Sequence, residues 1–148
     1  MPSSYTCLHY HLIWSTKDRR PMISPEIRDR LYSFIGGIIR NDGGVLLCAG
    51  GMPDHIHLSC SLDKKIALSD ALRDIKSNSS GWARETFGVE FAWQTGYAAF
   101  SVSHSGLEAL RSYLVGQEAH HRRISFKEEL VALLKKHEVE YDERYVFE

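Results

Sequence analysis

Two histidines separated by one residue are the clearest candidates for chemistry in this sequence. His55 and His57 flank Ile56 and follow a turn-forming run, GGMP, at residues 50–53. Successive side chains on a β-strand point to opposite faces, so both imidazoles project from one face while Ile56 and Leu58 point to the other. Two imidazoles fixed on a rigid strand can hold a divalent metal ion. The pair therefore predicts part of a metal site, which needs further ligands.

A second group of reactive side chains lies far along the chain, on a helix predicted over residues 106–121. Tyr113 and Gln117 are four residues apart, so they share one face of that helix. If this face meets the histidine strand, Gln117 gives the metal an oxygen ligand and Tyr113 lies beside it. Two nitrogens and one oxygen leave positions open for substrate and water. This ligand set suits Mg²⁺ or Mn²⁺, although imidazoles also accept Zn²⁺ or Ni²⁺.

Other residues compete for these roles. Cys60 has the opposite strand parity to the histidines, so we expect it to face the core, which disfavours a zinc site of two histidines and a cysteine. Asp54 also has the wrong parity, but as a turn residue it could orient an imidazole. A second pair, His9 and His11, is expected to pack or hydrogen-bond beside the site; contact of His11 with substrate is the alternative.

The elements that must position these residues follow from hydrophobic periodicity. Strands are predicted over 5–16, 45–49, the histidine segment and 97–103, with helices over 25–40 (N-cap Ser24), from an N-cap at Ser69 toward Trp82, over 106–121 and from 126. The order β-α-β-β-α-β-α predicts an α+β, ferredoxin-like split β-α-β sandwich. We expect one domain over 1–148, with an antiparallel sheet, helices on one face and a C-terminal helix that carries the tyrosine.

Composition places the chain among soluble globular proteins. Of its 148 residues, 43% are hydrophobic and 25% are charged. Three cysteines without metal-type spacing suit reduced thiols, and neither a signal peptide nor a membrane span is predicted, so we expect a cytoplasmic protein. The net charge is −1, yet residues 1–125 hold 14 basic and 12 acidic side chains, so the acidity lies in the tail.

This distribution permits a basic face that binds DNA. Candidate DNA-binding residues form three groups: Lys17, Arg19 and Arg20; Arg73 and Lys76; Arg122 and Arg123. A solvated helix face is the alternative for Arg73 and Lys76. Trp82, Trp93 and Tyr97 are candidate stacking platforms for bases, with core packing as the alternative for each.

Several motifs together resemble one known family. The stretch GMPDHIHL, the pair Tyr113 and Gln117 followed by EAHHRRISFKEE, the run WQTGYAAFSVS and the tail EYDERYVFE are similar to the small insertion-sequence transposases with one catalytic tyrosine. These belong to the HUH nuclease group, in which U is an apolar residue, and are related to the REP-associated tyrosine transposases. The likeness extends to YTCLHYHLIWSTKDR and LSDALRDIKSNSS, and so covers nearly the whole chain.

The resemblance implies a function and a site. It implies DNA transposition by metal-dependent cleavage and strand transfer of single-stranded DNA with hairpins, through a 5′-phosphotyrosine intermediate. By position, His55, His57 and Gln117 would bind Mg²⁺ or Mn²⁺ and Tyr113 would be the nucleophile, without a nucleotide cofactor. It further implies a homodimer in which the segment from about 104 docks on the partner, so that the tyrosine helix reaches the partner's histidines.

The sequence departs from the family pattern at one position next to the site. Family members often have Asn before the Gln, where this chain has Gly116. A glycine within a helix costs about 1 kcal/mol relative to alanine, so we expect a looser helix between Tyr113 and Gln117. A domesticated or replication-initiator-like HUH nuclease that nicks and rejoins DNA is one alternative function. A DNA-binding module with a decayed site is another.

Overall fold

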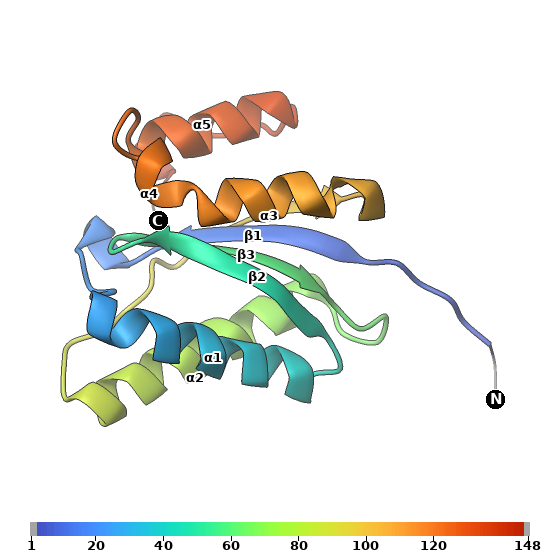
Figure 1. Cartoon of the computed structure of the whole chain (residues 1–148), viewed down its shortest axis with the longest axis horizontal. Coiled ribbons are helices and arrows are strands. Elements are labelled where there is room, and N and C mark those ends of the chain that lie inside the picture. The colour runs from blue at the N-terminus through green and yellow to red at the C-terminus, as the bar shows by residue number, and fades with distance from the viewer. Residues whose placement is uncertain (1–2, 147–148) are drawn as a thin grey trace.

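The core of the fold is a four-stranded antiparallel sheet. A computed structural model describes residues 3–146 (Figure 1). The strands lie in the order β2-β3-β1-β4, with every neighbouring pair antiparallel. Their bounds are β1 His9–Ser15, β2 Val45–Met52, β3 His55–Ser61 and β4 Ala98–Val102. The order along the chain, with one helix after β1 and another after β3, confirms the predicted split β-α-β arrangement.

Helices cover both faces of this sheet. Helices α1 (Pro25–Asn41) and α2 (Leu68–Phe87) pack on one face, and α3, α4 and α5 lie on the other (Figure 1). The bounds of the second group are α3 Leu107–Val115, α4 Gln117–His120 and α5 Phe126–Lys136. The described residues also form three short 3-10 turns: η1 Lys17–Arg19, η2 His104–Gly106 and η3 Glu143–Tyr145. The segment that carries Tyr113 is therefore separated from α1 and α2 by the sheet.

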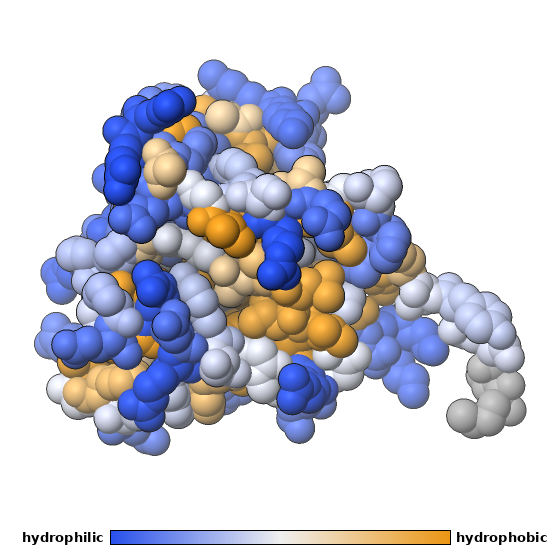
Figure 2. Space-filling view, viewed as in Figure 1, coloured by the Kyte–Doolittle hydropathy of each residue, from blue (hydrophilic) through white to orange (hydrophobic). Residues whose placement is uncertain are grey.

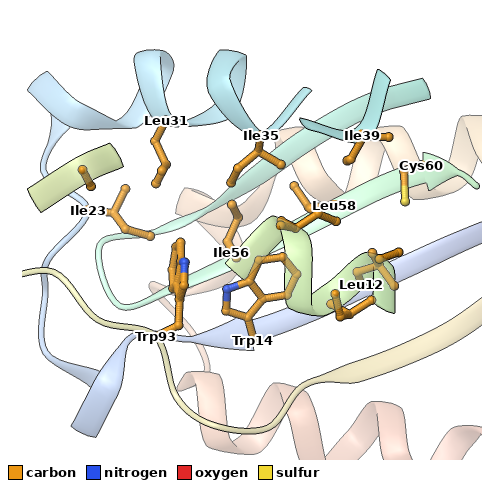
Figure 3. Packing of buried hydrophobic residues seen from close by; sticks show 14 of the residues in the cluster. Leu12, Trp14, Ile23, Leu31, Ile35, Ile39, Ile56, Leu58, Cys60 and Trp93 are labelled. Atoms are coloured by element: carbon orange, nitrogen blue, oxygen red, sulfur yellow. The ribbon is translucent and has the colours of Figure 1, made fainter. Parts of the chain in front are cut away.

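The main hydrophobic core fills the space between the sheet and the α1/α2 layer. Helical spacing places Leu31, Ile35 and Ile39 of α1 against the sheet, and all three are buried. From the sheet, alternate residues of β1 and β3 enter the same core (Figure 3). A smaller cluster packs α5 against the opposite face; its members are Ile13, Phe100, Phe126, Leu130 and Leu134. The two cores hold the sheet rigidly between two helical layers.

Several predicted boundaries were wrong. Strand β1 is shorter than 5–16, and β2 runs through the predicted turn at 50–53, so the hairpin turn comprises only Pro53 and Asp54. Helix α2 begins after Ala67 instead of Ser69 and continues to Phe87, where Gly88 ends it in a left-handed conformation. These errors arise because tertiary pairing extends or shortens elements beyond what local patterns encode.

The outer edge of the sheet is partly uncovered. Strand β2 is an edge strand, and its Val45 and Leu47 side chains are exposed. An apolar patch lies over this strand between α1 and α3 (Figure 2). The acidic tail continues beyond α5 through η3, while Phe147, at its predicted end, lies outside the described residues. Within residues 3–146, no helix combines the length and apolar character needed to cross a membrane.

Candidate active site

The two histidines of β3 form the base of the site. His55 and His57 are fully buried, and they project from the sheet face that α3 covers. Their neighbours Ile56 and Leu58, like Cys60, belong to the core on the other face. The parity prediction is thus confirmed, and Cys60 is placed away from the site.

A hydrogen bond at Nδ1 fixes each of these two imidazole rings. Nδ1 of His55 lies 2.7 Å from Oδ1 of Asp54, and Nδ1 of His57 lies 2.8 Å from Nε2 of His11. Burial raises the pKa of Asp54, but the hydrogen bond and charge of His55, a backbone hydrogen bond and the charge of His121 together outweigh this and hold the pKa below its usual value. Burial, followed by the proximity of His57, lowers the pKa of His11 to about 3. These contacts direct Nε2 of the two site histidines toward Gln117 of α4 and Glu129 of α5.

Tyr113 and Gln117 meet the histidines from the other side. The predicted single helix over 106–121 is wrong, because α3 ends at Val115 and Gln117 opens α4. Gly116 lies between them, and its backbone N–H still donates to Ser112 O. Oε1 of Gln117 lies 3.2 Å from Nε2 of His55, and the Tyr113 ring stands edge-on to His57 with 5.8 Å between the ring centroids. Tyr113 and Gln117 therefore both lie beside the histidines although α3 ends between them.

A glycine of β2 allows α3 to approach this closely. A Cβ atom added at Gly50 would lie 2.2 Å from the carbonyl oxygen of Leu114, inside van der Waals contact. Gly50 pairs with His57 across the hairpin, so the close approach occurs directly beside the histidines. Only a residue without a side chain permits this helix to rest on the strand.

A buried glutamate from α5 joins Tyr113 to the histidines and Gln117. Glu129 is 2% exposed, and its Oε2 accepts hydrogen bonds from the Tyr113 hydroxyl and, at 3.0 Å, from Nε2 of Gln117. Its Oε1 lies 2.9 Å from Nε2 of His57 and 3.1 Å from Nε2 of His121. The carboxylate therefore lies at the centre of the site.

These contacts shift the pKa values of the tyrosine and the glutamate in opposite directions. Burial, together with the hydrogen bond and negative charge of Glu129, raises the pKa of Tyr113 above its ordinary range. Burial alone would raise the pKa of Glu129, but contact with His57, then with Tyr113 and Gln117, holds it well below its usual value. Without a bound ion, the site therefore pairs a neutral phenol with an ionised carboxylate.

The donor set is suited to a divalent cation. Ligand atoms of His55, His57, His121 and Glu129 all lie within 4.8 Å of one another. Oε1 of Gln117 is 2.8 Å from Nε2 of His121, so the amide oxygen adjoins the same cluster. Imidazole nitrogens with carboxylate and amide oxygens are ligands that first-row divalent metals accept. The residues present therefore fit a metal ion.

Glu129 and His121 were not identified from the sequence. His121 is only the last residue of the helix predicted over 106–121, although it follows Gln117 by four residues, the spacing of neighbours on one helix face. Glu129 lies between Phe126 and Leu130 on the apolar face of α5. Burial of an unpaired carboxylate costs free energy, so a glutamate on the apolar face of a helix indicates a nearby partner. This pattern was the signal from which Glu129 could have been found.

The predicted DNA-binding residues fall in different places. Strand β1 brings the basic loop to the His55 end of the sheet, since Ser15 pairs with His55 and the 3-10 turn η1 follows. Helix α2 places Arg73 on the far side of the sheet, where it pairs with Asp70 at 3.1 Å. Nζ of Lys76 donates to the carbonyls of Thr95 and Gly96. The exposed members of the predicted set are Lys17, Arg19, Arg20, Arg73, Arg122 and Arg123.

The three candidate stacking residues also differ. Trp93 belongs to the hydrophobic core, as the alternative reading expected. Trp82 is half-buried and stacks on Phe34, with 4.5 Å between ring centroids. Tyr97 is 41% exposed. Of the three, Tyr97 is the most exposed, and Nζ of Lys76 lies 5.9 Å from the centre of its ring.

Comparison with known proteins identifies a matching family. A family model described as "Transposase IS200 like" matches residues 4–117. A relative from Deinococcus radiodurans, the ISDra2 transposase TnpA, is 26% identical over 117 residues, which cover 74% of this chain and 84% of that protein.

Two solved structures share the fold. One is the crystal structure of a candidate transposase from Deinococcus radiodurans R1, with a TM-score of 0.63, 24% identity, and coverage of 79% of this chain and 96% of that one. The other is a REP-associated tyrosine transposase bound to a REP hairpin, with a TM-score of 0.60, 15% identity, and coverage of 82% of this chain and 74% of that one.

Proposed function

Because this chain belongs to the IS200-like transposase family, a class of DNA-cleaving and strand-transferring enzymes, we propose that it cuts single-stranded DNA at hairpin-marked element ends by means of Tyr113. The observation that carries the proposal is the contact between the Tyr113 hydroxyl and Glu129 beside the buried histidine pair. The relative bound to a REP hairpin supports a DNA hairpin as the partner. A DNA substrate is consistent with the cytoplasmic location expected from the sequence.

The metal-binding residues in this proposal are His55, His57 and Gln117, with Glu129 and His121 adjoining them. We propose Mg²⁺ or Mn²⁺, because the site combines imidazole with oxygen donors and the substrate adds phosphate oxygens. When bound, the ion would polarise the scissile phosphate and offset the charge that develops on it.

The chain's own groups account for the chemical step. The Tyr113 oxygen attacks phosphorus and the bond from phosphorus to the 3′ oxygen breaks, which gives a 5′-phosphotyrosine and, after the leaving oxygen takes up a proton, a free 3′-hydroxyl. The Tyr113 hydroxyl donates to Glu129, which orients the phenol, and lies 3.5 Å from Nε2 of His120, so these two groups are the proton acceptors within reach. A phosphotyrosine ester is close in energy to a phosphodiester, so a second 3′-hydroxyl can resolve it without a nucleotide cofactor.

A denaturing gel tests this function directly. The protein is incubated with Mn²⁺ and a labelled single-stranded hairpin oligonucleotide, and a covalent adduct is expected. Tyr113→Phe should abolish the adduct, and the matched control Tyr145→Phe, at an exposed position in the tail, should retain it. An adduct that persists in Tyr113→Phe would exclude this nucleophile. Undiminished cleavage by His57→Ala would exclude the metal assignment.

We further propose a homodimer in which α3 is exchanged, so that each tyrosine serves its partner's histidines. In the single chain, Tyr113 already lies beside its own His57. A partner's helix could make the same contacts, because exchange of an identical element preserves them. The uncovered edge of β2 supports association, since an exposed edge strand can pair with a second chain.

Mixing two inactive variants tests this exchange. A heterodimer of Tyr113→Phe and His55→Ala chains has one intact site if the helix acts on its partner and none if it acts on its own chain. Recovered cleavage is therefore expected. Complete inactivity of verified heterodimers would instead assign each tyrosine to its own histidines.

A further inference from the structure

A second group of metal-ligating side chains lies away from the active site. Cys7 lies on the segment that leads into β1, His9 is the first residue of that strand, and His104 opens the turn η2 before α3. One ligand atom from each of the three lies within 4.8 Å of the other two. Although the cysteines show no metal-type spacing along the sequence, the fold brings one of them to two histidines.

The separations in this cluster approach those of a zinc site. Nε2 of His9 is 3.3 Å from Nδ1 of His104. Two nitrogens bound tetrahedrally at the usual zinc–nitrogen length lie about 3.3 Å apart, and a sulfur and a nitrogen lie about 3.6 Å apart. The two imidazoles therefore already have the spacing of ligands, and Cys7, whose ligand atom lies within 4.8 Å of theirs, requires a shift of at most about 1 Å at its exposed position.

The fold holds the segment that carries Cys7 in place. The Leu62 N–H donates to the carbonyl oxygen of Leu8 at 3.1 Å, so the residue between Cys7 and His9 is tied to the chain just after β3. The site is therefore part of the folded structure.

We propose that Cys7, His9 and His104 bind Zn²⁺, with water in the fourth position. A thiolate and two imidazoles select zinc over Mg²⁺ or Mn²⁺, which prefer oxygen ligands. This site is separate from the proposed catalytic metal site, whose described ligands include no cysteine. Zinc here would link the start of β1 to the segment just before α3, and so would restrain the helix that carries the tyrosine.

Cobalt substitution tests the proposal with a readout that is independent of DNA cleavage. Co²⁺ bound to a thiolate gives a charge-transfer absorption in the near ultraviolet, which ligation by histidine and carboxylate alone does not give. The reduced full-length protein, titrated with Co²⁺, should show this band, and added Zn²⁺ should remove it. Cys7→Ser should abolish the band, whereas the matched control Cys48→Ser should keep it.

The histidines are tested by affinity. His104→Gln should retain the thiolate band but raise the Co²⁺ midpoint roughly 10-fold or more, the loss typical of removing even an outer partner of a metal site. The proposal is overturned if Co²⁺ binds without a thiolate band, if the band survives Cys7→Ser, or if His104→Gln leaves the midpoint unchanged. These outcomes say nothing about the DNA adduct, so this proposal and the cleavage function fail separately.

Discussion

Replacing Gly50 with alanine should displace the helix that carries the tyrosine. The new Cβ would lie 2.2 Å from the carbonyl oxygen of Leu114, whereas real Cβ atoms essentially never approach closer than 3.0 Å. Strand β2 is held by its ladder to β3, and the clashing atom is backbone, so no flexible side chain can relieve the contact. Helix α3 must therefore move away from the sheet by about 1 Å.

This displacement acts more strongly on catalysis than on folding. Forced overpacking lowers the free energy of unfolding by roughly 1–3 kcal/mol. In a chain of this length, each kcal/mol lost lowers Tm by about 3 °C. A misplacement of about 1 Å at a reacting group can cost roughly 100-fold in rate. We therefore expect Gly50→Ala to remain folded at 25 °C and to form the tyrosine–DNA adduct about 100 times more slowly.

Thermal melts and single-turnover adduct formation measure the two effects on the same preparations. The matched control is Gly37→Ala in α1, where an added Cβ meets nothing within 4 Å. Alanine should stabilise that helix by roughly 0.5–1 kcal/mol and leave the adduct rate unchanged. If folded Gly50→Ala forms the adduct at the wild-type rate, the docking of α3 on β2 is not the active arrangement.

Three further perturbations test other parts of the site. Glu129→Gln keeps the side-chain volume but removes the charge, so isothermal titration should show Mn²⁺ binding weakened at least roughly 10-fold, and equal affinity would exclude a role at the metal. In the metal-free protein, folded His11 stays neutral below its ordinary pKa of 6.5, so the unfolded chain binds more protons and stability falls as pH drops from 6.5 toward about 3. Urea melts at a series of pH values should show that this group changes the free energy of unfolding by up to about 1.4 kcal/mol per pH unit. His11→Asn should reduce this pH dependence, and an unchanged pH dependence would contradict the assignment. Gly116→Asn should cleave within about 2-fold of wild type, because the φ of −86° at this position is open to any residue, and a large loss would show that the helix break needs glycine.

The parts of the site that local rules determine could be predicted from the sequence. Strand parity fixed the direction of His55 and His57 and removed Cys60, because alternation depends only on the backbone. The possible use of Asp54 as an orienting partner also followed from its adjacency to His55, and the structure shows that contact. The order of the four strands and of α1, α2 and α5 follows from periodicity in the same way, whereas the single helix predicted over 106–121 is divided into α3 and α4.

The remaining parts depend on how distant elements pack. Glu129 enters the site only because α5 turns back over the sheet, and no local pattern encodes that return. The end of α3 at Val115 was likewise not predicted, since Gly116 was treated as a weak point within one helix. Cys7 and His104 are far apart in the sequence, and their proximity depends on where the segment leading into β1 meets η2. In each case the missing information was a tertiary contact.

The position of Glu129 along the chain has a consequence for how such proteins are classified. The family match ends at residue 117, so it contains the histidine pair, Tyr113 and Gln117 but stops twelve residues before the carboxylate that contacts them. A chain truncated after this region would still match the family while lacking the acceptor of the tyrosine hydrogen bond. Sorting relatives by whether a carboxylate follows the matched region would therefore separate those that share this arrangement from those that must hold the phenol by other means.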